Sequence, residues 1–239
     1  MANGSRFKRA TVPELEPGIE PRFCVVIIPH FCDTTKDMNQ SFAPADSRRF
    51  EAALARFDEE NSRDPNLHTT GGKAAARELV YAQWLSDWVL RLKADASEPL
   101  RLAARSAHLC RWAIARASYP MTRAGYLRWR QELKAFHAQK VGTILNEIGY
   151  SSEIIKRVQD LVSKKAFPAD PESRVLEDAL CLVFLEHQFA DLAAKSEDDK
   201  MVNALKKTWN KMTPRAREIA KSLELGAHER ALMERALSN

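Results

Sequence analysis

Glycine is scarce in this sequence, and no glycine-rich loop of the kind that cradles phosphates is present. The chain has eight glycines among 239 residues, and they form neither a GxGxxG nor a GxxxxGK[ST] pattern. Both loops join a strand of a parallel sheet to a helix. Their absence argues against a nucleotide-binding α/β fold, and we expect no nucleotide cofactor.

Long hydrophobic runs and paired cysteines are missing as well. The apolar stretch at residues 23–28 is too short to span a bilayer, and residues 1–21 are too polar for a signal peptide. The four cysteines include no CxxC pair, which excludes the usual zinc-ribbon spacing. We therefore expect a cytoplasmic protein without a membrane partner, and the nucleus is the alternative location.

No run of five or six basic residues occurs, although the formal net charge is +5. A basic balance permits contact with phosphates or RNA, and solvated helix faces are its simpler explanation. Hydrophobic residues make up 45% of the chain and charged residues 29%, which are ordinary values for a globular domain. Composition therefore leaves the partner open.

What is present is helical periodicity from Asp46 onward. Residues 1–45 are rich in turn-forming residues and predict an irregular or disordered extension, in which residues 25–31 are either a strand or an apolar plug. Residues 46–239 predict one all-α domain, a bundle of about eight helices with essentially no sheet.

Capping residues and apolar spacing set the expected helix boundaries. Four helices are expected to start at Asp46 or Ser47, at Ser151 or Ser152, at Ser196, and at Thr213, which begins the last substantial helix. Another helix carries the apolar face from Glu78 to Leu92. Three more are expected from Ser97 to about Arg116, from Thr122 to near Gly149, and from Asp170 to about Ala194. Residues 61–72 are expected to form a loop. The helix at residues 172–194 is apolar nearly all round, which predicts a place at the centre of the bundle.

Four ionisable residues lie on helix faces where a charge needs a partner. Glu78, His137 and Asp178 share faces with apolar residues on three helices, and His108 lies on a polar stripe of a fourth. Helical bundles build metal sites from side chains that project inward from facing helices. These four residues are candidate ligands for a divalent transition metal, Mn, Fe, Ni or Zn. A structural salt bridge is the alternative for Asp178, and Glu177 is the alternative buried carboxylate.

Arginines and aromatic residues are dense between residues 105 and 130. Arginine binds phosphate oxygens in a bidentate manner, and aromatic rings stack on bases. The candidate substrate-binding residues are Arg105, Arg111, Trp112, Tyr119, Arg123, Tyr126, Arg128, Trp129 and Lys164. A phosphorylated small molecule, a nucleotide or RNA would suit this set, and ordinary arginine–aromatic packing is the alternative.

Six short segments of the helical part form a recognisable set. They are ELVYA at 78–82, LAAR at 102–105, HLCRW at 108–112, SYPM at 118–121, GYLRWR at 125–130 and LEDA at 176–179. Over residues 49–223 this set resembles an uncharacterised family whose members often carry the label glutamyl-tRNA synthetase. Such a synthetase needs a nucleotide-binding sheet with a HIGH-like motif, and neither is expected here. We therefore expect that the protein is not an aminoacyl-tRNA synthetase.

The order of helices is also similar, more distantly, to that of the HD-type metal-dependent phosphohydrolases. In that family a histidine, a His-Asp pair and a late aspartate bind metal from successive helices. In this sequence Glu78 lies near the first position, Ala107 and His108 at the pair, His137 at a downstream histidine and Asp178 at the late aspartate. The missing His-Asp dipeptide is a departure from the family pattern.

This second resemblance implies a reaction. A metal-bound water would attack a phosphate held by Arg105, Arg111 and Arg128. The sequence thus predicts a divergent metal-dependent phosphohydrolase for a phosphorylated small molecule or nucleotide. A non-catalytic RNA- or phosphate-binding module that uses the arginine–aromatic surface is the alternative.

Overall fold

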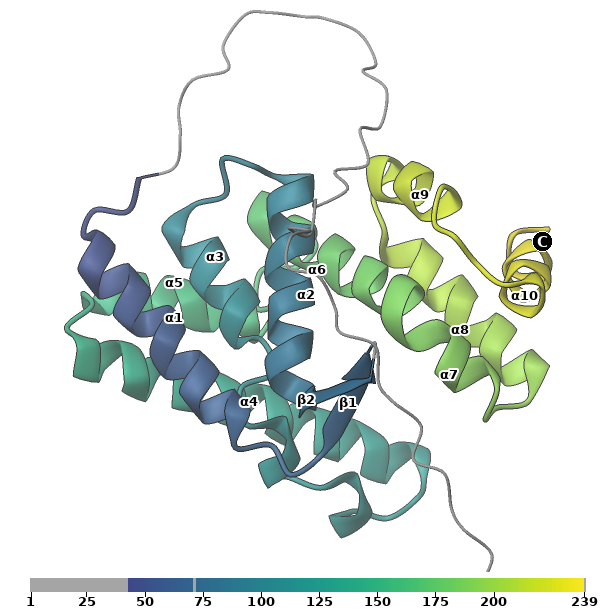
Figure 1. Ribbon diagram of the computed structural model, residues 1–239, viewed down its shortest axis with the longest axis horizontal. Helices are drawn as coiled ribbons and strands as arrows, with labels where there is room; N and C mark the ends of the chain where they lie inside the picture. Colours follow the sequence, from purple (N-terminus) through teal and green to yellow (C-terminus); the bar gives the residue numbers. More distant parts are fainter. Residues whose placement is uncertain (1–42, 71, 239) are drawn as a thin grey trace, which may run out of the picture. The chain divides into compact units, whose positions relative to one another are not determined.

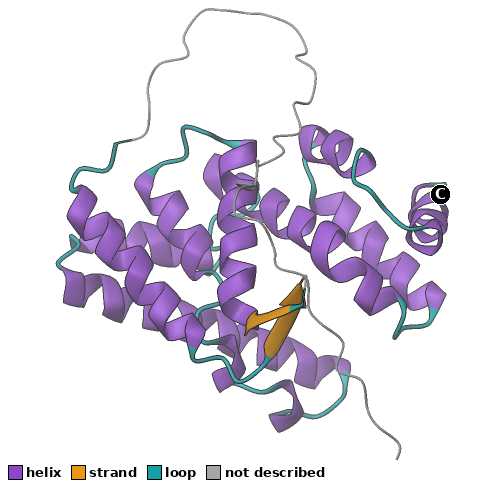
Figure 2. Ribbon diagram, in the orientation of Figure 1, coloured by secondary structure: helices purple, strands orange, loops and turns teal. Residues whose placement is uncertain are grey.

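Ten α-helices make up most of the described part of the chain, residues 43–70 and 72–238 of this computed structural model (Figures 1 and 2). They are α1 (Ser47–Ser62), α2 (Arg77–Leu92), α3 (Glu98–Ser106), α4 (Arg123–Ile148), α5 (Ser152–Val162), α6 (Pro171–Val183), α7 (Phe189–Ala193), α8 (Asp198–Lys211), α9 (Pro214–Lys221) and α10 (Ala227–Leu237). The predicted all-α fold class is confirmed. The strand or plug predicted at residues 25–31 lies outside the described residues.

Side-chain caps explain where most helices begin. The capping oxygens of Asp46, Ser97, Thr122, Ser151, Asp170 and Thr213 each accept a hydrogen bond from a backbone N–H in the first turn. Each satisfies one of the amides that a helix start leaves unpaired. The starts predicted at these residues are therefore confirmed, and α8 instead begins after Glu197, one residue beyond the predicted Ser196.

A small antiparallel sheet corrects the loop predicted at residues 61–72. There, α1 continues to Ser62, and β1 (Leu67–Thr70) pairs with β2 (Lys73–Ala76), so that Thr70 lies opposite Lys73 (Figure 2). Gly72 has a φ of +78°, a backbone conformation that glycine adopts without strain in a hairpin turn.

Three helix extents also differ from the prediction. The helix from Ser97 ends at Ser106 rather than near Arg116. After it the backbone bonds close tighter turns, from Leu109 N–H to the oxygen of Ser106, and Cys110 takes a left-handed conformation (φ 54°) that no α-helix can continue through. The chain continues through two 3-10 turns, η1 (Arg111–Ala113) and η2 (Arg116–Ser118). A π-helical segment, η3 (Phe184–Gln188), separates α6 from α7, and α10 follows α9, which was predicted to be the last substantial helix.

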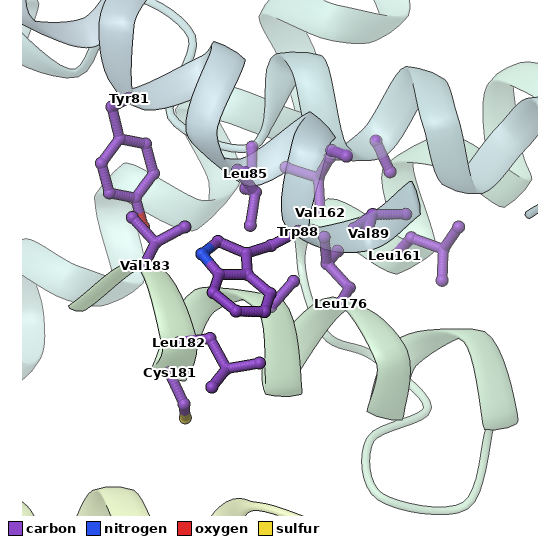
Figure 3. Close-up of a cluster of buried hydrophobic side chains, with 14 of the residues drawn as sticks. Tyr81, Leu85, Trp88, Val89, Leu161, Val162, Leu176, Cys181, Leu182 and Val183 are labelled. Atoms are coloured by element: carbon purple, nitrogen blue, oxygen red, sulfur yellow. The ribbon is translucent and has the colours of Figure 1, made fainter. Parts of the chain in front are cut away.

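Helix α6 lies at the centre of the packing, as predicted. It contacts α2, α3 and α5 on one side and α8 and α9 on the other (Figure 1). Leu85, Trp88 and Val89 of α2 meet Leu176 and Leu182 of α6 in a close-packed cluster (Figure 3). Burying each such side chain contributes about 1.5–3 kcal/mol. In the described residues, no helix combines the length and the apolar character needed to cross a membrane.

Candidate functional site

A cavity of about 250 Å³ lies between α4, the end of α5, α6 and α8, and we call it the basic cavity. Five cationic side chains line it: Arg111, Arg130, Lys134, Lys164 and Lys211. Glu177 is the one carboxylate among the described residues that line it, and His108 and His137 are the histidines. An apolar wall of Trp129, Leu133 and Phe184 completes it. Positive charge beside apolar surface suits an anion with an apolar part.

Helix α4 supplies one wall of the basic cavity through helical spacing. Tyr126, Arg130, Lys134 and His137 are three or four residues apart and therefore lie on one face. The start of this helix is fixed by Gly125, where any Cβ would collide with the backbone oxygen of Pro120. The preceding turn and this face of α4 are thereby held in register.

Glu177 is a resident counterion of the basic cavity. Its side chain is buried, and its carboxylate accepts hydrogen bonds from Lys164 and pairs with the Lys211 Nζ at 3.2 Å. Burial acts to raise the pKa of Glu177, but the two lysines outweigh it and the pKa is lowered. Glu177 therefore stays ionised and neutralises part of the positive charge.

The two histidines of the basic cavity are held neutral. Burial, followed by the charge of Arg111, lowers the pKa of His137 to about 4 and that of His108 well below its ordinary value. The His137 side chain is only 4% exposed, and its Nε2 has no hydrogen-bond partner among the described residues. A buried polar atom without a partner lowers the stability of the folded protein by about 1–3 kcal/mol. A bound polar group that pairs with this nitrogen would remove that cost.

Arg111 lies between the basic cavity and a second cavity of about 670 Å³, since it lines both. Its guanidinium carbon is 5.0 Å from the centre of the Trp129 ring. No described residue forms a hydrogen bond or an ion pair with the guanidinium group. Stacking thus fixes an arginine whose N–H donors remain open to a ligand.

The second cavity, which we call the upper cavity, contains the buried carboxyl of Glu78. One oxygen of Glu78 is 3.7 Å from Nδ1 of His108 and the other is 3.5 Å from a guanidinium nitrogen of Arg77. Burial raises the pKa of Glu78 to about 7, although Arg111 and Arg77 act in the opposite direction. The His108 ring stacks on Tyr81 with the ring centres 4.4 Å apart.

The structure brings three of the four predicted metal ligands near one another. Glu78 lies beside His108, and the ring centres of His108 and His137 are 5.9 Å apart. Asp178 is engaged elsewhere, because its two oxygens accept hydrogen bonds from the backbone N–H and the hydroxyl of Thr213, at 2.8 and 2.6 Å. Among the described residues, no three His, Cys, Asp or Glu side chains are grouped to hold a metal ion. These residues therefore do not fit the metal that the HD resemblance implies.

Five of the nine predicted substrate-binding residues line the two cavities: Arg111, Trp112, Tyr126, Trp129 and Lys164. Arg105 instead forms a bidentate ion pair with Asp58, with both N···O distances 2.6 Å. The Tyr119 hydroxyl donates to Glu132 at 2.5 Å. Arg123 and Arg128 are exposed, and neither is among the described residues that line the two cavities.

The predicted substrate-binding set omitted three cations of the basic cavity, Arg130, Lys134 and Lys211, although Arg130 ends the segment 125–130 whose arginines and aromatics had marked it as a candidate. Helical spacing from Tyr126 would have found the first two, since they lie four and eight residues after it. No local signal marks Lys211, which reaches the cavity because α8 packs against α6.

Comparison with known proteins identifies a family for this domain. The family model described as Domain of unknown function (DUF4202) matches residues 51–233. No curated protein and no solved structure matches the chain. The resemblance to HD phosphohydrolases therefore stays a prediction, whereas the expectation of an uncharacterised family is confirmed. Because the matching model runs from α1 into α10, the chain belongs to the DUF4202 family.

Proposed function

We propose that the chain binds a phosphorylated small molecule in the basic cavity. The observation that carries the proposal is the charge imbalance of the lining, in which five cationic side chains face a single carboxylate, Glu177, among the described residues. The summed positive charge of the lining attracts an anion to the basic cavity.

Two unsatisfied groups point to the same kind of ligand. The guanidinium of Arg111 has no ion pair or hydrogen bond with a described residue, and Nε2 of His137 is buried without a partner in that part of the chain. A phosphate group accepts through three oxygens, so it can accept from the guanidinium of Arg111 and, in the tautomer that carries its proton on Nε2, from His137 together. The wall formed by Trp129, Leu133 and Phe184 would contact the apolar part of the molecule.

The proposal covers binding and contains no metal-dependent step. Hydrolysis by a metal-bound water was the finer prediction, and it requires the four predicted ligands to act together. Both oxygens of Asp178 are bonded to Thr213, and the described residues include no group suited to a metal. The geometry therefore supports the phosphate-binding part of that hypothesis.

RNA binding is the second candidate, and it has less support. An RNA surface places cations along an open face where they follow the phosphate backbone. Here Arg105 is paired with Asp58, and three cations that form no ion pair with a described residue, Arg111, Arg130 and Lys134, line the basic cavity. The exposed Arg123 and Arg128 at the start of α4 are what remain of the predicted RNA surface.

Titration calorimetry with inorganic phosphate and pyrophosphate at constant ionic strength tests the proposal. We expect Arg111→Ala and Arg130→Ala to weaken binding of both anions by about tenfold or more, as for loss of a charge-assisted contact. Arg128→Ala is the matched control, because Arg128 is on α4 with Arg130 and lines neither cavity. Equal weakening by all three substitutions, or no binding by the wild-type chain at millimolar anion, would refute the proposal.

A further inference from the structure

The upper cavity differs in chemistry from the basic cavity. Three arginines line it, but Arg77 pairs with Glu78, and Arg116 donates to the backbone oxygens of Tyr119 and Pro120 at 3.0 and 2.9 Å. Arg111 is the one without such a partner among the described residues. The protein itself therefore engages N–H donors of Arg77 and Arg116, and Arg111 is the arginine whose donors stay open to a ligand, so the rest of the upper cavity suits a polar, uncharged group.

Groups that recognise a flat, polar ring line this compartment. Trp112 is half-buried and makes no ring–ring or cation–π contact with a described residue, so its indole ring is not already stacked. Asn66 donates through its amide nitrogen to Asp64 at 2.7 Å, which leaves its side-chain oxygen to accept. The side-chain amide of Gln188 has no hydrogen-bond partner among the described residues and offers both a donor and an acceptor.

The two cavities meet at a shared wall. His108, Arg111 and Trp129 line both of them, so only the side chains of these shared residues separate a group bound in one cavity from a group bound in the other. The basic cavity, at about 250 Å³, is large enough for a phosphate, whereas the upper cavity, at about 670 Å³, falls in the range of sites for small molecules. The arrangement suits a ligand with a charged end and an uncharged ring.

From this arrangement we propose that the ligand is a nucleoside phosphate, with its phosphate in the basic cavity and its base in the upper cavity against Trp112. The inference rests on the proposed function, since it assigns the rest of the molecule whose phosphate the basic cavity holds. The amides of Asn66 and Gln188 and the carboxyl of Glu78 face the edge of the base. Arg111, at the shared wall, contacts the phosphate from the side of the sugar.

The test compares ligands that share a phosphate and differ in the base. Calorimetric titrations use ribose 5-phosphate and the four common nucleoside 5′-monophosphates. We expect at least one monophosphate to bind about tenfold or more tightly than ribose 5-phosphate, the gain typical of stacking a base on an aromatic side chain. If no monophosphate binds more tightly than ribose 5-phosphate, the base compartment is refuted and the phosphate site stands. If no phosphate ligand binds at all, both proposals fail.

Substitution of Trp112 tests whether the extra affinity of a nucleoside monophosphate over ribose 5-phosphate comes from stacking on this residue. Trp112→Leu is expected to reduce monophosphate affinity to that of ribose 5-phosphate and to leave ribose 5-phosphate affinity within about twofold, while Trp112→Phe retains most of the gain. Trp84→Leu is the matched control, because Trp84 is also half-buried but lines neither cavity and stacks on His187. A monophosphate preference that survives Trp112→Leu would overturn the placement of the base. Should the leucine variant fail to fold, the comparison of ligands on the wild-type chain and the phenylalanine variant still decides.

Discussion

At the scale of single residues, the proposed anion site makes a prediction about Glu177. Its carboxylate occupies Lys164 and Lys211, which a phosphate would otherwise contact. Glu177→Gln removes this competitor, and we expect phosphate affinity to rise by about five- to tenfold, the size of one charge-assisted contact. The free energy of unfolding should fall by about 1–3 kcal/mol, because Lys164 keeps its charge in a largely buried position without its partner.

The control for this prediction is Glu172→Gln on the same helix. Glu172 pairs with Arg157 and does not line the basic cavity. Calorimetry and urea denaturation on the wild-type chain and both variants measure the two effects. Unchanged phosphate affinity in Glu177→Gln would show that the lysines are not part of the anion site.

Glu78 gives the protein a stability that depends on pH. Burial raises its pKa from 4.5 to about 7 in the folded chain, so the folded state holds more protons than the unfolded state between these values. The free energy of unfolding therefore falls as pH rises through this window, by on the order of 2–3 kcal/mol. His137 acts in the opposite direction, because its folded pKa of about 4 lies below 6.5 and its contribution is lost as pH falls.

Glu78→Gln isolates the first of these effects. We expect the wild-type chain to lose stability relative to this variant between pH 5 and pH 8, since glutamine does not titrate. The low pKa values of His108 and His137 come chiefly from burial and from Arg111, which the substitution leaves in place, so both histidines contribute to both proteins. Urea denaturation across this range gives the difference directly. A difference that does not change with pH would mean that Glu78 titrates as it does in the unfolded chain.

At the scale of helices and turns, Asp178 joins α6 to α9. Its oxygens accept from the backbone N–H and the hydroxyl of Thr213, the residue that caps α9. Asp178→Asn keeps one acceptor and presents an amide N–H to one of the donors, so we expect the free energy of unfolding to fall by about 1–2 kcal/mol. Phosphate affinity should be unchanged, because Asp178 does not line the basic cavity.

Urea denaturation, calorimetry and elemental analysis of the purified variant check this prediction. Thr213→Ser is the matched control, because it keeps both donors and should retain most of the stability. A stoichiometric transition metal that is present in the wild-type chain and absent from Asp178→Asn would contradict the structural role and restore the metal hypothesis.

Helix starts were predictable from sequence because the caps are local. The hydroxyl of Ser97 reaches the amide of Leu100 within one turn, and the sequence around it suffices to predict that bond. Helix ends within the fold were less predictable. The left-handed turn at Cys110 is held by a bond from its N–H to the side chain of Asn61, 49 residues away, and no local pattern encodes that contact.

The same distinction applies to the candidate site. The density of arginines and aromatics identified Arg111 and Trp129 because both lie in one short segment. Their neighbour Lys211 comes from α8 and was missed, since only the packing of α8 on α6 brings it there. Asp178 was correctly expected to be buried and to need a partner, but periodicity does not tell a metal from the hydroxyl of Thr213.

At the scale of the whole molecule, the basic cavity joins parts of the chain that are distant in sequence. Its lining comes from the turn between α3 and η1, from α4, from the end of α5 and the turn after it, from α6 and from α8. A ligand that contacts all of them is bound only by the folded state, so it should stabilise the entire domain against unfolding. Stabilisation by a ligand is therefore a readout of the site that does not depend on any assumed reaction.

Thermal unfolding with and without pyrophosphate measures this effect. At a pyrophosphate concentration about 100 times Kd, the stabilisation is about 2.7 kcal/mol, which for a domain of this size raises Tm by roughly 5–10 °C. Sodium chloride at the same ionic strength is the control for general screening. We expect Arg111→Ala to lose most of the shift and Arg128→Ala to keep it, because only the first lines the cavity. An equal shift in both variants would mean that pyrophosphate acts on the surface of the protein, and the cavity would then have no part in anion binding.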